Sequence, residues 1–186
     1  ATLRWHIFER FSTVWGWHGQ WDDVLAVTKK THQDWRWHRW VARAIKDQTG
    51  ADVAICENPL RFADSLVAGP LSYRMLANTF QNFWIVTIEL DGSQLRKMLM
   101  VPFNDILERK IDAPAIEGIA FVKRGFDSEE TFLKIQEVES GKKYRLACNY
   151  KCLNGKRVGQ VLDDYRIIGQ MHLVPMLREY LEGTSG

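Results

Sequence analysis

A short run of small apolar residues, ADVAIC at 51–56, constrains the fold of this chain most strongly. Such a run predicts a buried strand. The next residues, ENPLRF, place Asn58 and Arg61 directly after the strand ends. A polar pair at that point is typical of a binding site, but it is also typical of a turn whose backbone needs hydrogen-bond partners. The residues alone leave both alternatives open.

A helix is predicted immediately before this strand. Trp37, Trp40 and Val41 begin an apolar pattern at helical spacing that extends over residues 35–48. Asp34 is a candidate N-cap, and Gly50 is a candidate terminating glycine.

Further helices and strands follow along the chain. A Gly-Pro turn and a candidate N-cap, Ser72, precede a short predicted helix through Met75 and Leu76. β-branched and aromatic residues predict a strand at 82–90, and the next segment predicts a helix. We expect Pro102 to interrupt that helix, with a second helical stretch after it.

The last third of the chain changes to strand patterns. Three candidate strands, within 118–126, 131–138 and 142–151, are separated by polar turns and are expected to be neighbours. A final helix is predicted at 173–182. The fold class is therefore mixed α and β (α/β, of the α+β kind), with a mixed sheet and packed helices.

Length and charge set broad limits on the class of protein. With 186 residues, the chain fits one domain. Its net charge of +2 is too small to indicate binding to a nucleic-acid polymer. No apolar stretch reaches the roughly 18 residues that a membrane-spanning helix needs, and no signal segment is recognisable at the start. We therefore expect a soluble protein.

Seven of the eight tryptophans lie in the first forty residues. We divide the chain into a Trp-rich N-terminal segment, 1–33, and a domain, 34–186. The tryptophans are explained by mutual packing or a domain interface, or alternatively by exposed platforms for a sugar, a protein partner or a second copy of the chain. The 1–33 segment is either an interface or part of the same domain.

The three cysteines, Cys56, Cys148 and Cys152, allow at most one internal disulfide. Two of them fall in predicted buried strands, so buried thiols are expected. The C-x3-C spacing from 148 to 152 has no second pair and no histidine at ligand spacing, which argues against a metal site.

Four segments occur in a specific order between residues 48 and 99: TGADVAICEN, LR, AGPLSYRMLANTFQN and IVTIELDGSQLRKML. This order resembles the C-terminal domain of the 5'-nucleotidase family, which also includes 2',3'-cyclic-nucleotide phosphodiesterases and UDP-sugar hydrolases. SGKKYRLACNY, at 140–150, is similar to the last core strand of that family. The resemblance covers residues 45–160.

The resemblance implies substrate recognition by this domain. Arg61 would contact the nucleotide, since its planar fork suits phosphate or ribose oxygens. Phe80 would stack on the base, Asn82 would bond the base edge, and Tyr150 could supply a second ring. Asn58 would bond the backbone of the loop after its strand. The structural alternatives are a surface or capping arginine, a core phenylalanine and an asparagine that begins a strand.

The sequence also departs from the family pattern. Pro59 and Leu60 replace glycines, which makes close approach of the backbone to a ligand doubtful. Lys151 occupies the aligned position of the second aromatic ring, and Lys156 and Arg157 replace an acidic loop. These departures suit either a more anionic ligand or a lost site.

The resemblance implies hydrolysis by a separate N-terminal metallophosphoesterase domain with two metal ions. Its signatures, Asp-x-His, Gly-Asn-His-Asp/Glu and Gly-His-x-His, do not occur in this sequence. We identify no catalytic residue, and we expect this chain alone to bind a nucleotide or nucleoside without hydrolysing it. Divalent ions are expected only in the partner domain, and the family implies nucleotide catabolism in the periplasm or outside the cell.

A second hypothesis belongs to another class of function. The chain would keep the same fold with a degenerate pocket, and the Trp-rich segment would hold a protein partner or a glycan. Arg43, which stands where the family tends to have an aspartate, is one more departure of this kind.

Overall fold

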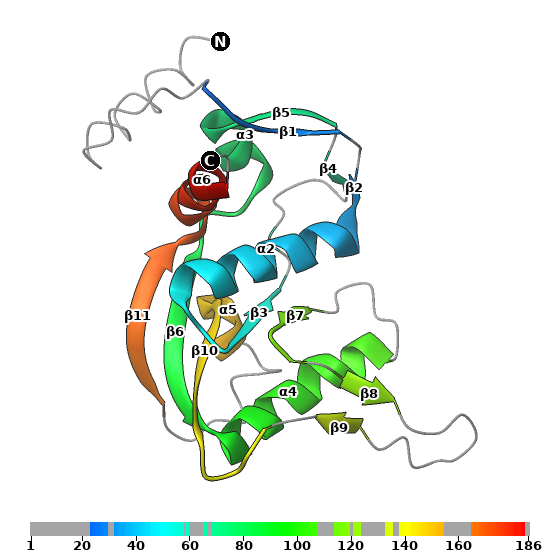
Figure 1. Cartoon of the computed structure of the whole chain (residues 1–186), viewed down its shortest axis with the longest axis vertical. Helices are drawn as coiled ribbons and strands as arrows, with labels where there is room; N and C mark the ends of the chain where they lie inside the picture. The colour runs from blue at the N-terminus through cyan, green and yellow to red at the C-terminus, as the bar shows by residue number, and fades with distance from the viewer. Residues whose placement is uncertain are drawn as a thin grey trace.

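A computed structural model gives the architecture of the chain (Figure 1). It describes residues 23–29, 32–57, 59, 65–66, 68–107, 114–119, 121–123, 133–135, 138–154 and 165–184. The centre is a five-stranded sheet in the order β11-β6-β10-β3-β7. Its strands are β3 (Val53–Cys56), β6 (Trp84–Asp91), β7 (Ala115–Glu117), β10 (Lys143–Asn149) and β11 (Arg166–His172).

Both parallel and antiparallel pairs occur in this sheet. β10 lies parallel to β3, with Cys148 opposite Ile55, and antiparallel to β6, with Asn149 opposite Ile85. β11 and β7 pair antiparallel with β6 and β3 and form the two edges. The sheet is mixed, as the sequence predicts. The carboxyl ends of β3 and β10 and the start of β6 therefore meet at one end of the sheet.

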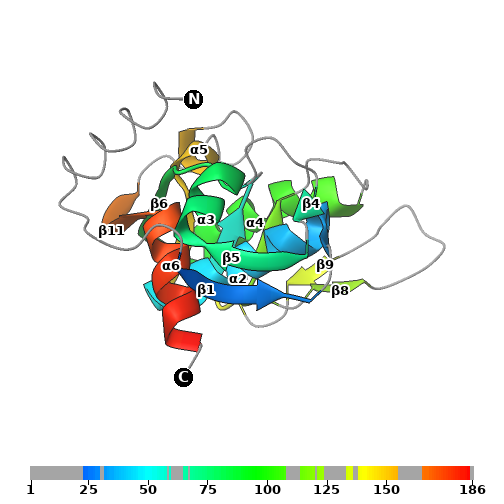
Figure 2. The ribbon, with the colours of Figure 1, turned by 90° about the horizontal axis from the view of Figure 1, so that it is seen from above.

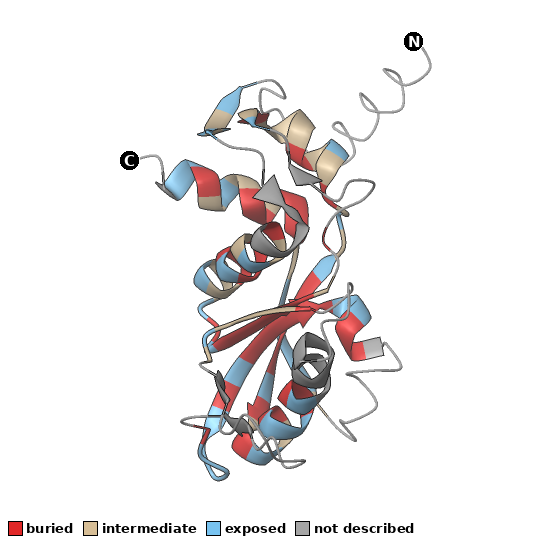
Figure 3. Cartoon of the chain, turned by 90° about the vertical axis from the view of Figure 1, so that its right-hand side faces the viewer, coloured by how far each residue is buried: buried red, intermediate tan, exposed pale blue. Residues whose placement is uncertain are grey.

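Helices cover the two faces of the sheet (Figures 1 and 2). One face contacts α2 (Asp34–Thr49) and α6 (Leu173–Thr184), and the other contacts α4 (Gly92–Leu107) and α5 (Tyr150–Asn154). In Figure 2, α6 and α5 lie on opposite sides of β6. Buried residues predominate in the central strands β3, β6 and β10, whereas the edge strand β11 is mostly exposed (Figure 3).

Helix α2 matches the prediction closely. It begins at Asp34, and Gly50 follows its end with a φ of 61°, in the left-handed region that glycine adopts easily. Trp37 and Trp40 pack on each other with ring centroids 5.3 Å apart. Trp40 also meets Tyr180 of α6 edge to face, at 5.9 Å. Mutual packing therefore accounts for both of these tryptophans.

The end of the molecule beside α6 carries the short elements. Helix α3 (Tyr73–Thr79) is capped by Ser72, whose hydroxyl oxygen accepts from the backbone N–H of Met75, as expected. β1 (Val24–Thr28) pairs with β5 (Gly69–Ser72), and β2 (His32–Gln33) pairs with β4 (Ser65–Leu66). Strands within the 1–33 segment thus pair with strands of the rest of the chain.

Helix α4 begins at a capping aspartate and does not end where the sequence predicts. Asp91 caps the helix through its Oδ1, which accepts from the backbone N–H groups of Ser93 and Gln94. Pro102 does not interrupt it, because α4 is continuous to Leu107. The prediction of two helices was wrong. Buried residues of the preceding turns anchor α4 on the sheet, and this packing offsets the backbone bond that proline removes.

The late strands are not all neighbours, and this prediction was also wrong in part. β8 (Phe121–Lys123) and β9 (Leu133–Ile135) pair with each other in a separate two-stranded sheet. β10 instead enters the central sheet, between β3 and β6. Strand β11 was not predicted, because its exposed edge position leaves little apolar periodicity in the sequence.

None of the helices in the described ranges is long and apolar enough to cross a membrane.

Candidate functional site

The candidate site lies at the end of the sheet where β3 and β10 stop and β6 starts. Asn149 is the last residue of β10 and is only 1% exposed. Its Oδ1 accepts from the backbone N–H of Glu57 at 3.1 Å, and its Nδ2 donates to the backbone oxygen of Glu57 at 3.2 Å. This two-bond contact, which we call the Asn149 latch, fixes the point at which the chain leaves β3.

Three thiols lie around the latch, and all of them are buried and free. Cys152, in α5, donates from its Sγ to Asn149 Oδ1 at 2.7 Å. Burial raises the pKa of both Cys56 and Cys152 far above the usual thiol range, with smaller contributions from neighbouring groups. Cys56 and Cys152 therefore stay protonated at neutral pH, and all three buried thiols pack as small apolar groups, as the sequence predicts.

Phe80 lies in the core on the other side of this end. Its side chain is 0% exposed, and its ring centroid is 6.4 Å from those of Trp37 and Trp40. A ring with no exposed area offers no face to a nucleobase in this arrangement. The geometry matches the alternative left open by the sequence, a core phenylalanine.

Asn82, two residues later, is exposed and precedes β6. Its Oδ1 accepts from the backbone N–H of Val174 at 3.2 Å, and the backbone oxygen of Phe83 accepts from Leu173 N–H at 3.0 Å. Asn82 therefore holds the first turn of α6. With the oxygen engaged, the NH₂ group is the part of the amide best placed to donate to a ligand.

Tyr150 is the remaining predicted contact within the described residues. It begins α5 directly after Asn149, and its side chain is 42% exposed. Lys151, at the aligned position of the family's second ring, is also exposed. Asn58, Arg61, Leu60, Lys156 and Arg157 lie outside the described residues. Tyr150 and Asn82 thus lie at one end of the sheet, with Tyr150 in α5 and Asn82 beside α6 across the sheet, and Arg61 stays a prediction.

Sequence reasoning missed Trp84 and His172 at the same end. They face each other across β6 and β11, and their rings are stacked with centroids 3.7 Å apart and planes 32° apart. Trp84 is 42% exposed. Burial lowers the pKa of His172, and a hydrogen bond with the backbone of Asn82 opposes this shift. The signal was present in the sequence, since Trp84 is the one tryptophan outside the N-terminal cluster.

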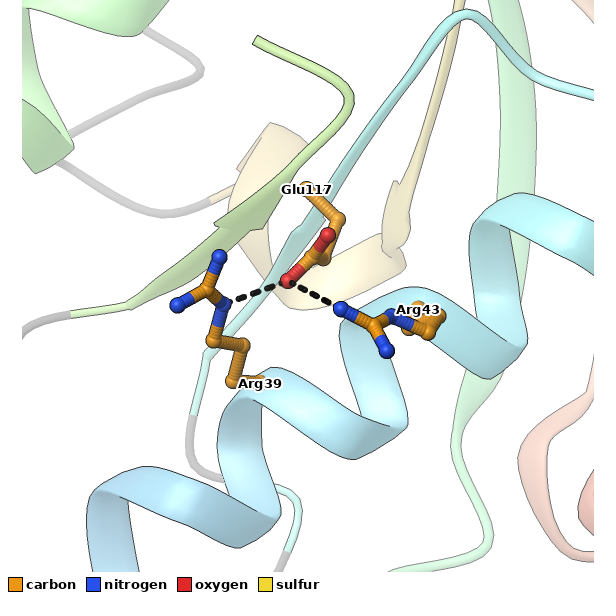
Figure 4. A network of polar contacts seen from close by, with 3 residues as sticks. All are labelled: Arg39, Arg43 and Glu117. Atoms are coloured by element: carbon orange, nitrogen blue, oxygen red, sulfur yellow. Dashed lines mark hydrogen bonds and ion pairs between the residues drawn. The ribbon is translucent and has the colours of Figure 1, made fainter. Parts of the chain in front are cut away.

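Arg43, noted as a departure from the family, contacts the opposite edge of the sheet (Figure 4). Glu117 of β7 accepts from Arg39 Nε at 2.6 Å, and its Oε1 is 3.9 Å from Arg43 Nη2. Both arginines belong to α2, so the carboxylate ties this helix to the edge strand. The arginines are largely exposed, and we expect the pairs to add little stability.

Among the residues with described positions, no three His, Cys, Asp or Glu side chains are grouped so that they could hold a metal ion.

Comparisons with known proteins show which solved structures have a similar fold. No protein-family model matches the sequence, and no curated protein matches it. Solved structures do match it. The 5'-nucleotidase precursor of Thermus thermophilus is similar at 14% identity and a TM-score of 0.62, and the match covers 88% of this chain and 37% of that chain. The NAD nucleotidase of Haemophilus influenzae gives 13% identity and a TM-score of 0.68, with 88% and 36% covered.

A third similar structure is that of an enzyme with a different activity. The sulfate thiohydrolase SoxB of Thermus thermophilus, in complex with glycerol, gives 14% identity and a TM-score of 0.57, with 87% of this chain and 32% of that chain covered. This chain therefore spans about a third of the length of these proteins. At such identities the likeness concerns the fold, and the fold is that of the C-terminal domain of the 5'-nucleotidases, as the sequence resemblance predicts.

Proposed function

We propose that this chain is the nucleotide-recognition domain of a 5'-nucleotidase-type phosphoester hydrolase. The observation that carries the proposal is the fold likeness, which extends over 88% of this chain in two nucleotidases. The chain corresponds to 37% and 36% of those two proteins, which leaves room in each for another domain. Since one fold hosts many functions, the ligand must be argued from the site.

The end of the sheet at the Asn149 latch supports this assignment. Ligands of α/β proteins commonly bind outside the carboxyl ends of strands, and β3 and β10 both end here. Tyr150 offers an exposed ring for a base, and the amide of Asn82 offers a hydrogen-bond donor. In this proposal Arg61, five residues after β3, supplies a guanidinium for the phosphate.

Hydrolysis belongs to a separate metallophosphoesterase domain in this proposal. Two divalent ions in that domain would activate water and stabilise the charge that develops on the phosphoryl oxygens. The chain described here would hold the base and sugar in place for that reaction. A periplasmic or extracellular location goes with the proposal, as the family resemblance implied.

Titration with nucleotides followed by NMR tests the proposal. Adenosine, AMP and UMP are each added to the ¹⁵N-labelled chain while backbone amide signals are followed. Shifts confined to residues at the end of β10, the start of β6 and the segment after β3 support nucleotide recognition. If none of the three ligands moves any signal, the proposal fails, and an interaction module with the same fold becomes the better hypothesis.

A further inference from the structure

Trp84 is unusual in its exposure. Trp37 is 5% exposed and Trp40 is half-buried, whereas the side chain of Trp84 is 42% exposed at the start of β6. Indole is the largest side chain, so leaving so much of its area in water forgoes a large gain from burial. An exposed tryptophan held in one orientation is the arrangement found at ligand platforms and binding hot spots.

The orientation of Trp84 is held by His172. The ring centroids lie 3.7 Å apart and the planes are inclined by 32°, so one face of the indole rests on the imidazole. His172 also occupies the position directly opposite Trp84 in the pairing of β6 with β11. The exposed area of Trp84 consequently belongs to the face and edge of the indole that do not contact the imidazole. The strand backbone and the imidazole together fix the orientation of the ring.

Tyr150 lies at the same end of the sheet. Asn149 pairs with Ile85, and Trp84 and Tyr150 each stand one residue beyond this last pair, with Tyr150 at the first position of α5. We call His172, Trp84 and Tyr150 the aromatic row. The side chains of Trp84 and Tyr150 are both 42% exposed.

The surroundings of the aromatic row are polar and partly basic. Gln170 and Lys151 are exposed on the neighbouring strand and helix, and Asn82 stands two residues before Trp84. Flat aromatic faces with adjacent amides and an ammonium group suit a planar heteroaromatic ring that carries hydrogen-bonding edges and an attached anion. A long apolar peptide would need more apolar area than the row offers.

We infer that Trp84, backed by His172 and flanked by Tyr150, is the stacking platform for the nucleobase, in the role that the family pattern assigns to Phe80. The inference rests on the proposed function and names the residue that carries it out. Phe80 lies in the core, and the exposed ring of Trp84, four residues later, contacts the base instead. In this inference Lys151, which follows Tyr150 and is also exposed, supplies an ammonium group for the phosphate or ribose.

The test combines indole NMR signals with affinities for three probes. The chain has eight tryptophans, and the Trp84 indole N–H signal is assigned by its loss in Trp84→Phe. AMP, adenosine and ribose 5-phosphate are then titrated into the full 186-residue chain. Affinity for AMP is measured by calorimetry for Trp84→Ala, Trp84→Phe and Ile168→Ala. Ile168 is a matched control because it is equally exposed, at 42%, on β11.

We expect AMP and adenosine to shift the Trp84 indole signal and ribose 5-phosphate to leave it unchanged. Trp84→Ala should weaken AMP binding about tenfold or more, which is the effect of removing one stacking ring. Trp84→Phe should keep most of the affinity because a ring remains, and Ile168→Ala should keep all of it. The indole shift requires no destabilising variant, so the test stands even if Trp84→Ala folds poorly.

Two negative results have different meanings. If AMP moves backbone amides while the Trp84 indole signal stays fixed and Trp84→Ala binds AMP normally, the platform inference is overturned and the proposed function survives. If no signal moves with any probe, the proposed function fails and the inference fails with it.

Discussion

The Asn149 latch gives the sharpest prediction about stability, through the substitution Asn149→Ala. The side chain is 1% exposed and makes two hydrogen bonds to the backbone of Glu57 and one to Cys152. A typical intramolecular hydrogen bond contributes about 1 kcal/mol, and a thiol bond less, so the free energy of unfolding should fall by about 2–3 kcal/mol. The loss arises because these contacts connect the ends of two adjacent parallel strands.

Thermal and urea unfolding followed by circular dichroism measure this change. For a domain of this length, each kcal/mol shifts Tm by about 2–4 °C, so Asn149→Ala should lower Tm by about 4–12 °C. Asn78→Ala is the matched control, because Asn78 is exposed on α3 and its replacement should change stability by less than about 0.5 kcal/mol. Equal Tm values for the two variants would refute the idea that the latch stabilises this end of the sheet.

Three further predictions test other parts of the structure. Gly118 has a φ of 96°, and a Cβ there would overlap the backbone oxygen of Asp52, so Gly118→Ala should lower the free energy of unfolding by roughly 2–4 kcal/mol in a urea titration. Gly141 has open space around it, so Gly141→Ala should be nearly neutral in the same titration. Burial lowers the pKa of His172, so the contribution of this residue to stability is present above the ordinary histidine pKa of about 6.5 and is lost as the pH falls below that value. The decrease in Tm between pH 7 and pH 5 should therefore be smaller in His172→Asn than in the original chain. An equal decrease in both would contradict this. Because all three thiols are buried, a colorimetric thiol reagent at pH 8 should react slowly with the native chain and promptly with three thiols after denaturation; rapid native reaction would show that the latch region opens.

Much of the fold could be predicted from the sequence because the decisive signals are local. The apolar spacing through Trp37 and Val41, the terminating Gly50 and the cap at Ser72 each depend on a few adjacent residues. The buried run before Glu57 likewise identifies β3. The order of these elements then carried the family resemblance, and the fold was confirmed.

The failures depend on tertiary context. Pro102 should end a helix by local rules, but packing of α4 on the sheet keeps the helix continuous. The strand at β10 pairs with β3 and β6, which are distant in sequence, and no local pattern specifies those partners. β11 alternates poorly because one edge of the sheet is exposed.

The candidate site at the end of β3 stays a prediction, and the structure shows how its predicted residues are arranged. The sequence predicted a site at the end of β3, and Asn82 and Tyr150 are exposed at that end of the sheet. It could not distinguish Phe80, which enters the core between tryptophans, from Trp84, which lies on the surface, because both are aromatic residues near one strand start. Tertiary packing decides which ring is exposed, because Phe80 ends α3 against the tryptophans of α2 and Trp84 begins β6.

A crystal structure of this chain grown with AMP tests the central claim most directly. The account predicts the adenine ring parallel to the exposed face of Trp84, with atoms in van der Waals contact at about 3.5–4 Å, and with Tyr150 beside it. An adenine bound elsewhere on the chain, with the indole of Trp84 in contact only with His172 and water, would contradict it.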